Sequence, residues 1–251
     1  MLKNERLEIM RKYYPNAITL IDSVNKSIDY YEEFLELEPS KIMFADSICS
    51  DDVNSIQYPT RAQLFLGPFK MGGLNGFPFT GLTGMKAFAS HVPDDGAILI
   101  YYGPHIGISK NGMIGEIHRV GQSKNSTCCG AAKMALDKLF NNEIIDSEIT
   151  HIDYQMNVLE QILLKQTSRI IKSDLPIVEA TEVIYEAIDQ RINDLVSRTK
   201  YNCKYVILMG AILINSDSDM GSFTATKRFD VINITDHSRK SIIDEFLSLF
   251  K

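Results

Sequence analysis

Ile42-Met43-Phe44-Ala45 is an apolar run that is followed closely by Cys49-Ser50-Asp51-Asp52. The run predicts a buried strand, and the polar residues after it are expected at the C-terminal mouth of that strand. Open α/β sheets build their active sites at this edge. A second apolar run, residues 97–102, leads to His105, and a helix rich in small residues is predicted to open at Cys128-Cys129. These patterns predict an α/β fold in which three chain turns carry Cys and His side chains.

The remaining sequence alternates between predicted helices and strands. Apolar residues at helical spacing predict two helices within residues 7–37, interrupted at Pro15, and we interpret residues 1–38 as an N-terminal helical arm. Residues 51–83 are rich in turn-forming residues. No internal repeat is found, so residues 1–251 are expected to form one domain whose α/β core spans 39–251. Strands are predicted at 41–45, 97–102, 205–215 and 223–234, a hairpin at 106–117, and helices at 80–90, 127–140, 152–171, 178–196 and 238–250.

Composition excludes several classes of function. The chain has 251 residues and 45% hydrophobic residues, enough for a large core. Its formal net charge is -6 and its basic residues are scattered, so nucleic acid is not an expected partner. No window approaches the roughly 20 apolar residues that cross a membrane. The N-terminus lacks the apolar core of a signal peptide, and the four cysteines do not form a disulfide pattern, so we expect a cytoplasmic protein with reduced thiols.

Four positions carry side chains suited to chemistry, and each also has a simpler structural explanation. Cys49 taken alone is typical of a buried structural thiol. Asp51 and Asp52 repel each other and contribute little to a core, so they favour a site that uses charge. His105 follows Gly and Pro just beyond a predicted strand, where a surface histidine in a turn is the simpler explanation.

Cys128 and Cys129 could be small packing residues at the start of a helix. However, the pKa of a thiol falls at a helix N-terminus, which favours the thiolate that a zinc ion requires. With Cys49 and His105, they therefore predict a Cys-His-Cys zinc site. The pattern leaves either Cys128 or Cys129 as the last ligand.

Four motifs also occur in a defined order: Gly72-Gly73-Leu74-Asn75-Gly76-Phe77-Pro78-Phe79-Thr80-Gly81, His91-Val92-Pro93-Asp94-Asp95-Gly96, Tyr102-Gly103-Pro104-His105-Ile106-Gly107 and Cys128-Cys129-Gly130-Ala131-Ala132. They resemble those of the limiting-CO2-inducible protein B/C (LCIB) family, which is related to the θ-class carbonic anhydrases and similar to β-carbonic anhydrases. The resemblance is strong over about residues 40–140. It implies a β-carbonic-anhydrase-like α/β fold with a central, mostly parallel sheet flanked by helices.

The resemblance also implies roles for individual residues. Family members bind zinc through a Cys after the first strand, a His after the second and a later Cys at a helix start, which correspond here to Cys49, His105 and, by the family spacing, Cys129. Asp51 matches the aspartate of a catalytic Asp-Arg dyad. The resemblance also implies an arginine about a dozen residues beyond the first Cys, which falls here on Arg61. In β-carbonic anhydrases this arginine comes two residues after the aspartate, a position that is Val53 in this chain.

The activity implied by the resemblance is that of a carbonic anhydrase (carbonate dehydratase), which reversibly hydrates CO2 to bicarbonate. Three protein ligands leave the fourth position of Zn²⁺ open for water, whose pKa the metal lowers to about 7. Zinc-bound hydroxide, oriented by Asp51, would then attack CO2. Because CO2 is apolar, a dry pocket is expected. Its candidate walls are Leu74, Phe77 and Phe79, although core packing explains each of them equally well.

Two alternatives remain open from the sequence. A family member could keep the fold and bind zinc without catalysis, acting through protein partners, although such a module has no need for a dyad. A different zinc hydrolase or a deaminase is also compatible with Cys and His ligands, but the deaminase signature of His-x-Glu followed by Pro-Cys-x-x-Cys is missing. The resemblance further implies a homodimer in which the N-terminal helices embrace the partner chain.

Overall fold

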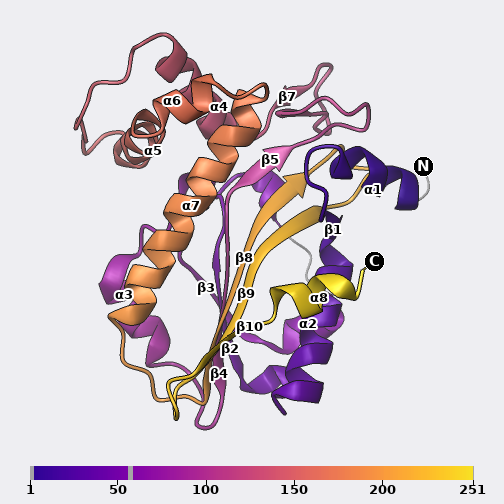
Figure 1. Cartoon of the computed structure of the whole chain (residues 1–251), viewed down its shortest axis with the longest axis vertical. Coiled ribbons are helices and arrows are strands. Elements are labelled where there is room, and N and C mark those ends of the chain that lie inside the picture. The colour runs from indigo at the N-terminus through magenta and orange to yellow at the C-terminus, as the bar shows by residue number, and fades with distance from the viewer. Residues whose placement is uncertain (1–2, 56–58, 251) are drawn as a thin grey trace.

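The structure, a computed structural model, describes residues 3–55 and 59–250. A sheet with the strand order β1-β9-β8-β4-β2-β3 lies between two layers of helices (Figure 1). β5 pairs with β8, and β10 pairs with β9. The strands of this sheet are β1 (Ile18–Thr19), β2 (Ile42–Ser47), β3 (Leu66–Lys70), β4 (Ala97–Tyr102), β5 (His105–Gly107), β8 (Tyr205–Asn215), β9 (Phe223–Asn233) and β10 (Arg239–Ser241), and a separate ribbon pairs β6 (Glu116–Ile117) with β7 (Ser126–Thr127).

The sheet is mostly parallel. β3, β2, β4 and β8 run in the same direction, and β5 is also parallel to β8. β9 is antiparallel to β8, while β1 and β10 are antiparallel to β9. Strands of a parallel sheet are covered on both faces and read as continuous apolar runs. Every residue of β4 is buried, as this rule requires. The predicted α/β fold with a central, mostly parallel sheet is therefore confirmed.

Two apolar clusters cover the two faces of the sheet. Residues of α3, α4, α5 and α7 pack on one face, and those of α2 and α8 pack on the other (Figure 1). None of the helices in the described residues has the length and apolar character that a membrane crossing needs. The helices are α1 (Lys3–Arg11), α2 (Leu20–Phe34), α3 (Gly81–Ala89), α4 (Gly130–Phe140), α5 (Tyr154–Leu164), α6 (Thr167–Ile171), α7 (Pro176–Ser197) and α8 (Ile243–Ser248), with short 3-10 turns η1 (Pro39–Lys41), η2 (Asp52–Asn54), η3 (Thr60–Leu64) and η4 (Leu74–Gly76).

The carboxyl ends of β2 and β4 lie side by side. Ser47 at the end of β2 is in register with Tyr102 at the end of β4. The chain leaves β4 through Gly103, whose backbone has φ +152 and whose added Cβ would stand 1.6 Å from the carbonyl oxygen of Ala211. Only glycine permits this close approach. The loop after β2 and the start of β5 therefore meet at one edge of the sheet.

Most predicted elements are present, and the differences have local causes. The strand at 205–215 has the predicted bounds, whereas the helix predicted over 152–171 is divided into α5 and α6. At the division, Thr167 Oγ1 donates to the Leu164 carbonyl at 2.6 Å, a local bond that competes with the helical pattern. β3 lies in the stretch that the sequence assigned to turns.

The N-terminal segment contains the two predicted helices, α1 and α2. α2 packs on the sheet of its own chain, where Tyr31 is buried and its ring centroid lies 6.1 Å from that of Phe229. Between the two helices, β1 adds a short strand to β9. The expectation that these helices embrace a partner chain stays a prediction.

Candidate metal centre

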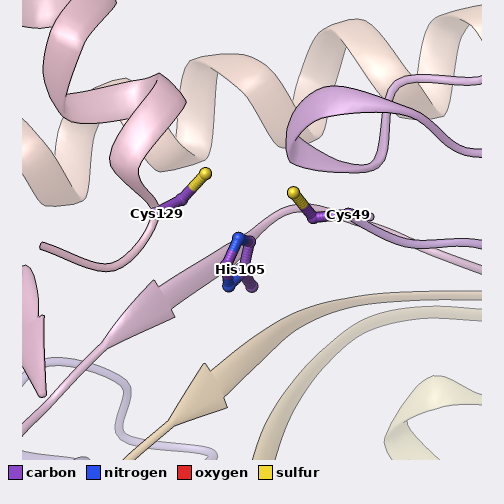
Figure 2. Close-up of side chains that lie close together, drawn as sticks. All are labelled: Cys49, His105 and Cys129. Atoms are coloured by element: carbon purple, nitrogen blue, oxygen red, sulfur yellow. The ribbon is translucent and has the colours of Figure 1, made fainter. Parts of the chain in front are cut away.

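Three side chains from separate turns converge at the carboxyl edge of the sheet. Cys49 follows β2, His105 opens β5, and Cys129 is the residue before the first turn of α4. One ligand atom from each lies within 4.8 Å of the others, and all three residues are buried. Figure 2 shows the two sulfur atoms directed toward one another beside the imidazole ring. Sequence reasoning identified all three, and the structure brings them together.

The donor set suits zinc. Zn²⁺ binds Cys sulfur at about 2.3 Å and His nitrogen at about 2.0–2.1 Å in tetrahedral sites. Two sulfurs and one nitrogen within 4.8 Å of one another can therefore share a single ion after small adjustments. Three donors would leave one position for a further ligand, which is the arrangement of catalytic sites. Cys49, His105 and Cys129 accordingly fit the metal that the sequence predicted.

The orientation of His105 is fixed by Asn215, the last residue of β8. Asn215 Nδ2 donates to the carbonyl oxygen of Val53 and to Asn54 Oδ1, both at 3.2 Å. Its Oδ1 therefore faces His105 Nδ1, at 2.7 Å, and accepts the proton of that nitrogen. His105 Nε2 is left buried without a partner in residues 3–55 and 59–250. A buried lone pair held in this way is typical of a metal-ligating histidine.

The two thiols share their protons unequally. A hydrogen bond from Cys129, together with the nearby imidazole of His105 and the backbone N–H of Asp51, outweighs burial and lowers the pKa of Cys49 to about 4. The same hydrogen bond with Cys49, reinforced by burial, raises the pKa of Cys129 well above its usual value. One thiol of the pair thus ionises readily, as metal binding requires.

Cys128 lies close to Nδ1 of the imidazole ring of His105. Its Sγ is 3.6 Å from His105 Nδ1 and 3.7 Å from Asn215 Oδ1. Since Nδ1 is already bonded to Asn215, this thiol is next to the nitrogen that is not available to a metal ion. The geometry therefore favours Cys129 over Cys128 as the third ligand.

Asp51 is held by Arg119, a residue that sequence reasoning missed. Arg119 Nη1 donates to Asp51 Oδ1 at 3.1 Å, and Nη2 donates to Oδ2 at 3.0 Å. Nη1 also reaches Asp52 at 2.7 Å, and Nε donates to Ser126. Burial alone would raise the pKa of Asp51, but the hydrogen bonds from Arg119, Asp52 and the backbone N–H of Val53, together with the nearby His105, outweigh it and lower the pKa to about 2. Asp51 is therefore a carboxylate at neutral pH.

The expected pairing of Asp51 with Arg61 is wrong. Arg61 lies in η3 and donates to Asp29 and Glu32 of α2, each at 2.6 Å. Both of its amino groups are thus engaged on the helix that covers the opposite face of the sheet. The hairpin predicted at 106–117, closed by the Ile108–Ile114 bridge, is followed by the segment that brings Arg119 to the site instead.

The candidate pocket residues form part of an apolar cluster. Leu74 and Phe77 are partly buried against the core, and the rings of Phe77 and Phe79 lie 5.1 Å apart. Phe79 also meets Tyr154 edge-on at 5.7 Å. Their role as walls for CO2 stays a prediction. An open cleft of about 580 Å³ has Asp52 and Arg119 in its wall, so the Asp51–Arg119 pair adjoins a route to solvent.

Solved structures resemble this fold closely. The crystal structure of PtLCIB4, a homolog of the limiting CO2-inducible protein LCIB, is similar with a TM-score of 0.80 and 26% identity, covering 94% of this chain and 98% of that chain. The crystal structure of LCIB itself is similar in fold, with a TM-score of 0.68 and 17% identity over 92% of this chain and 96% of that chain.

Sequence comparison gives the family. No match is found among curated proteins. The sequence model of the limiting CO2-inducible proteins B/C beta carbonic anhydrases matches residues 18–233, a span that contains Cys49, Asp51, His105, Arg119 and Cys129. The resemblance noted in the sequence motifs is thereby confirmed, and this chain belongs to the family of limiting CO2-inducible proteins B/C beta carbonic anhydrases.

Proposed function

We propose that this protein is a zinc-dependent carbonic anhydrase that reversibly hydrates CO2 to bicarbonate. The observation that carries the proposal is the convergence of Cys49, His105 and Cys129 next to a carboxylate that an arginine holds on both oxygens. Membership of a carbonic anhydrase family supports the same reaction. A purely structural zinc site would have four protein ligands and no use for an oriented carboxylate.

Zinc held by these three residues would supply a Lewis acid that lowers the pKa of a bound water to about 7. The protein's own residues would orient the metal ligands and keep the pocket apolar. Asn215 keeps the proton of His105 on Nδ1, so that Nε2 carries a lone pair that is available to a metal ion. Leu74, Phe77 and Phe79 are proposed to keep the neighbouring surface apolar, which suits CO2.

Asp51 is proposed to accept a hydrogen bond from the attacking oxygen and so to orient it. With a pKa of about 2 it stays ionised at neutral pH, which makes it an acceptor only. Arg119 engages both carboxylate oxygens and would prevent Asp51 from swinging to the metal. The working dyad is thus Asp51 with Arg119.

Stopped-flow proton release after mixing with CO2 tests the proposal. The zinc-loaded protein should hydrate CO2, and a chelator-stripped sample should not. Asp51→Asn should keep one zinc per chain and lose activity by about a hundredfold or more, because the orienting acceptor is gone. Zinc at one per chain without any hydration above the stripped control would contradict catalysis and favour a binding role.

The homodimer expected from the resemblance is also a proposal. Light scattering coupled to size exclusion measures the mass in solution directly. A mass of twice 28.3 kDa is the expected result, and a single-chain mass would reject it. Cytoplasmic location is likewise proposed, from the free cysteines.

A further inference from the structure

Asn75 bridges two of the three candidate metal ligands. Its backbone N–H donates to Cys49 Sγ at 3.1 Å, and its side-chain Oδ1 accepts the backbone N–H of His105 at 3.2 Å. The residue is fully buried in η4 and adopts a left-handed conformation with φ 51 and ψ 22. Asparagine tolerates this conformation better than most residues. Asn75 therefore adjoins the candidate metal site.

The two ends of the Asn75 amide can be told apart. The backbone N–H of His105 can only donate, so the atom that faces it must be the oxygen. Nδ2 then points elsewhere, and it is buried without a hydrogen-bond partner in the part of the chain that the structure describes. Proteins rarely leave a buried amide donor unpaired, because its desolvation is costly. This donor therefore calls for an acceptor outside the described residues, and a bound ligand can supply one.

The ligand of the site has the right chemistry to be that acceptor. CO2 and bicarbonate present oxygen atoms in every direction, and negative charge builds on the CO2 oxygens as the carbon is attacked. A fixed donor aimed at such an oxygen lowers the barrier in a water-poor site. It also offsets the repulsion between bicarbonate and the thiolates.

We propose that Asn75 Nδ2 donates a hydrogen bond to an oxygen of CO2 or bicarbonate bound at the Cys49–His105–Cys129 site. The inference deepens the proposed carbonic anhydrase function and rests on it. Asn75 transfers no proton: in CO2 + H2O → HCO3⁻ + H⁺ the proton leaves the attacking water. Asn75 only binds the oxygen that gains charge.

Two substitutions isolate the donor. Asn75→Asp keeps the oxygen that faces His105 and the backbone N–H that faces Cys49, but replaces the NH2 group with an oxygen. Asn75→Gly accepts the positive φ and removes the amide without adding charge. Agreement between the two variants separates loss of the donor from charge repulsion.

The decisive experiment uses cobalt(II) in place of zinc, because its visible spectrum reports both metal geometry and anion binding. Bicarbonate is titrated into the cobalt-loaded wild type and both variants. We expect the metal bands to persist and bicarbonate to bind about tenfold to hundredfold more weakly in both variants. Wild-type affinity in metal-loaded Asn75→Gly would overturn the inference, since repulsion alone would then explain any effect of Asn75→Asp.

A second measurement covers the case in which Asn75→Gly cannot hold the metal. CO2 is neutral, so Asn75→Asp does not repel it in the ground state. Zinc-loaded Asn75→Ala, which is neutral and lacks the amide, is therefore measured beside Asn75→Asp, because the charge of the aspartate also repels the anionic transition state. Unchanged kcat/KM for CO2 hydration in either variant would overturn the inference, and a fall of about tenfold or more in both would support it.

The same data separate this inference from the proposed function. Wild type that binds bicarbonate, with both variants weakened, but does not hydrate CO2 would reject the function and leave the donor assignment standing. Wild type that hydrates CO2, with both variants binding bicarbonate normally, would reject only the role of Asn75. A cobalt-loaded wild type that does not respond to bicarbonate would overturn the inference as well.

Discussion

The side chains of Asn215 and His105 meet at 2.7 Å, with Asn215 Oδ1 facing Nδ1 of the imidazole. Because Asn215 comes from the end of β8 and His105 from the start of β5, this contact ties the tautomer of the histidine to the sheet. It leaves Nε2 as the nitrogen for a metal. β8 therefore positions a metal ligand through Asn215, although β8 itself contributes no ligand.

Replacing Asn215 should weaken zinc binding. Asn215→Leu has a similar size but offers no acceptor to Nδ1, so zinc affinity should fall about tenfold to hundredfold. Asn215→Asp is the matched control, because its carboxylate still accepts from Nδ1, and it should retain more affinity than the leucine variant. Competition with a chromophoric chelator measures both. Wild-type affinity in Asn215→Leu would show that the contact does not position the ligand.

Arg119, and not Arg61, should matter for activity. Arg119→Met removes the partner of Asp51 and is expected to lower CO2 hydration about tenfold to hundredfold. Arg61→Met is the matched control: within the described residues Arg61 forms ion pairs with Asp29 and Glu32, away from Asp51, so this variant should leave the rate unchanged. Stopped-flow rates at equal zinc content decide between them, and the reverse outcome would restore Arg61 to the dyad.

Arg61 should instead make a small, pH-dependent contribution to stability. Its hydrogen bond lowers the pKa of Asp29 below 3.8. A lowered carboxyl pKa stabilises the fold above the unfolded value, and this contribution is lost as pH falls through the folded value. Because the pair is partly exposed, Arg61→Met should cost less than about 1 kcal/mol near neutral pH. Urea unfolding should show this cost shrinking below pH 3.8, and a constant cost down to the lowest pH would contradict the assignment.

The two adjacent cysteines should behave differently. Cys129→Ala removes a donor from the ligand cluster and should abolish stoichiometric zinc binding. Cys128→Ala should retain zinc, because Cys128 Sγ lies beside the nitrogen of His105 that Asn215 already occupies. Metal analysis of both dialysed variants tests the choice. Retention of zinc by Cys129→Ala together with its loss from Cys128→Ala would exchange the roles.

Gly103 should be indispensable for the fold. An alanine there would place Cβ 1.6 Å from the carbonyl oxygen of Ala211 in a strained backbone conformation, so Gly103→Ala should cost more than about 4 kcal/mol of unfolding free energy. Gly130→Ala is the control: its Cβ would meet nothing closer than 3.7 Å, and its effect should lie between none and a gain of about 1 kcal/mol. Denaturant unfolding measures both, and equal stability of the two variants would refute the steric argument.

Much of the fold was predictable because its central strands are long and apolar. β8 and β4 have the predicted bounds, since both faces of each strand are buried and no polar residue interrupts the pattern. β3 was not recognised. Its sequence contains Gly67 and Pro68 and its residues are mostly exposed, so it carries the composition of a turn. Its pairing with β2 is decided by the tertiary structure.

The sequence predicts those site residues whose type is typical of metal ligands. It does not predict residues that belong to the site only through a contact formed in the folded structure. Cys49, His105 and Cys129 are recognisable by residue type at the ends of apolar runs. Arg119 lies far from Asp51 in sequence, and nothing in its neighbours distinguishes it from the other arginines. Asn215 did leave a signal: it is a polar residue that ends an apolar strand at the edge where Cys49 and His105 lie.

The wide spacing of Cys49, His105 and Cys129 along the chain has a thermodynamic meaning. The first two are 56 residues apart and the last two 24 residues apart. An ion that binds all three closes two long loops only in the folded chain, so, unlike a disulfide, it stabilises the fold through its binding free energy and not by restricting the unfolded chain. The described cysteines are all free, so no disulfide joins them, and a bound metal ion would link the β2, β5 and α4 segments in the folded chain.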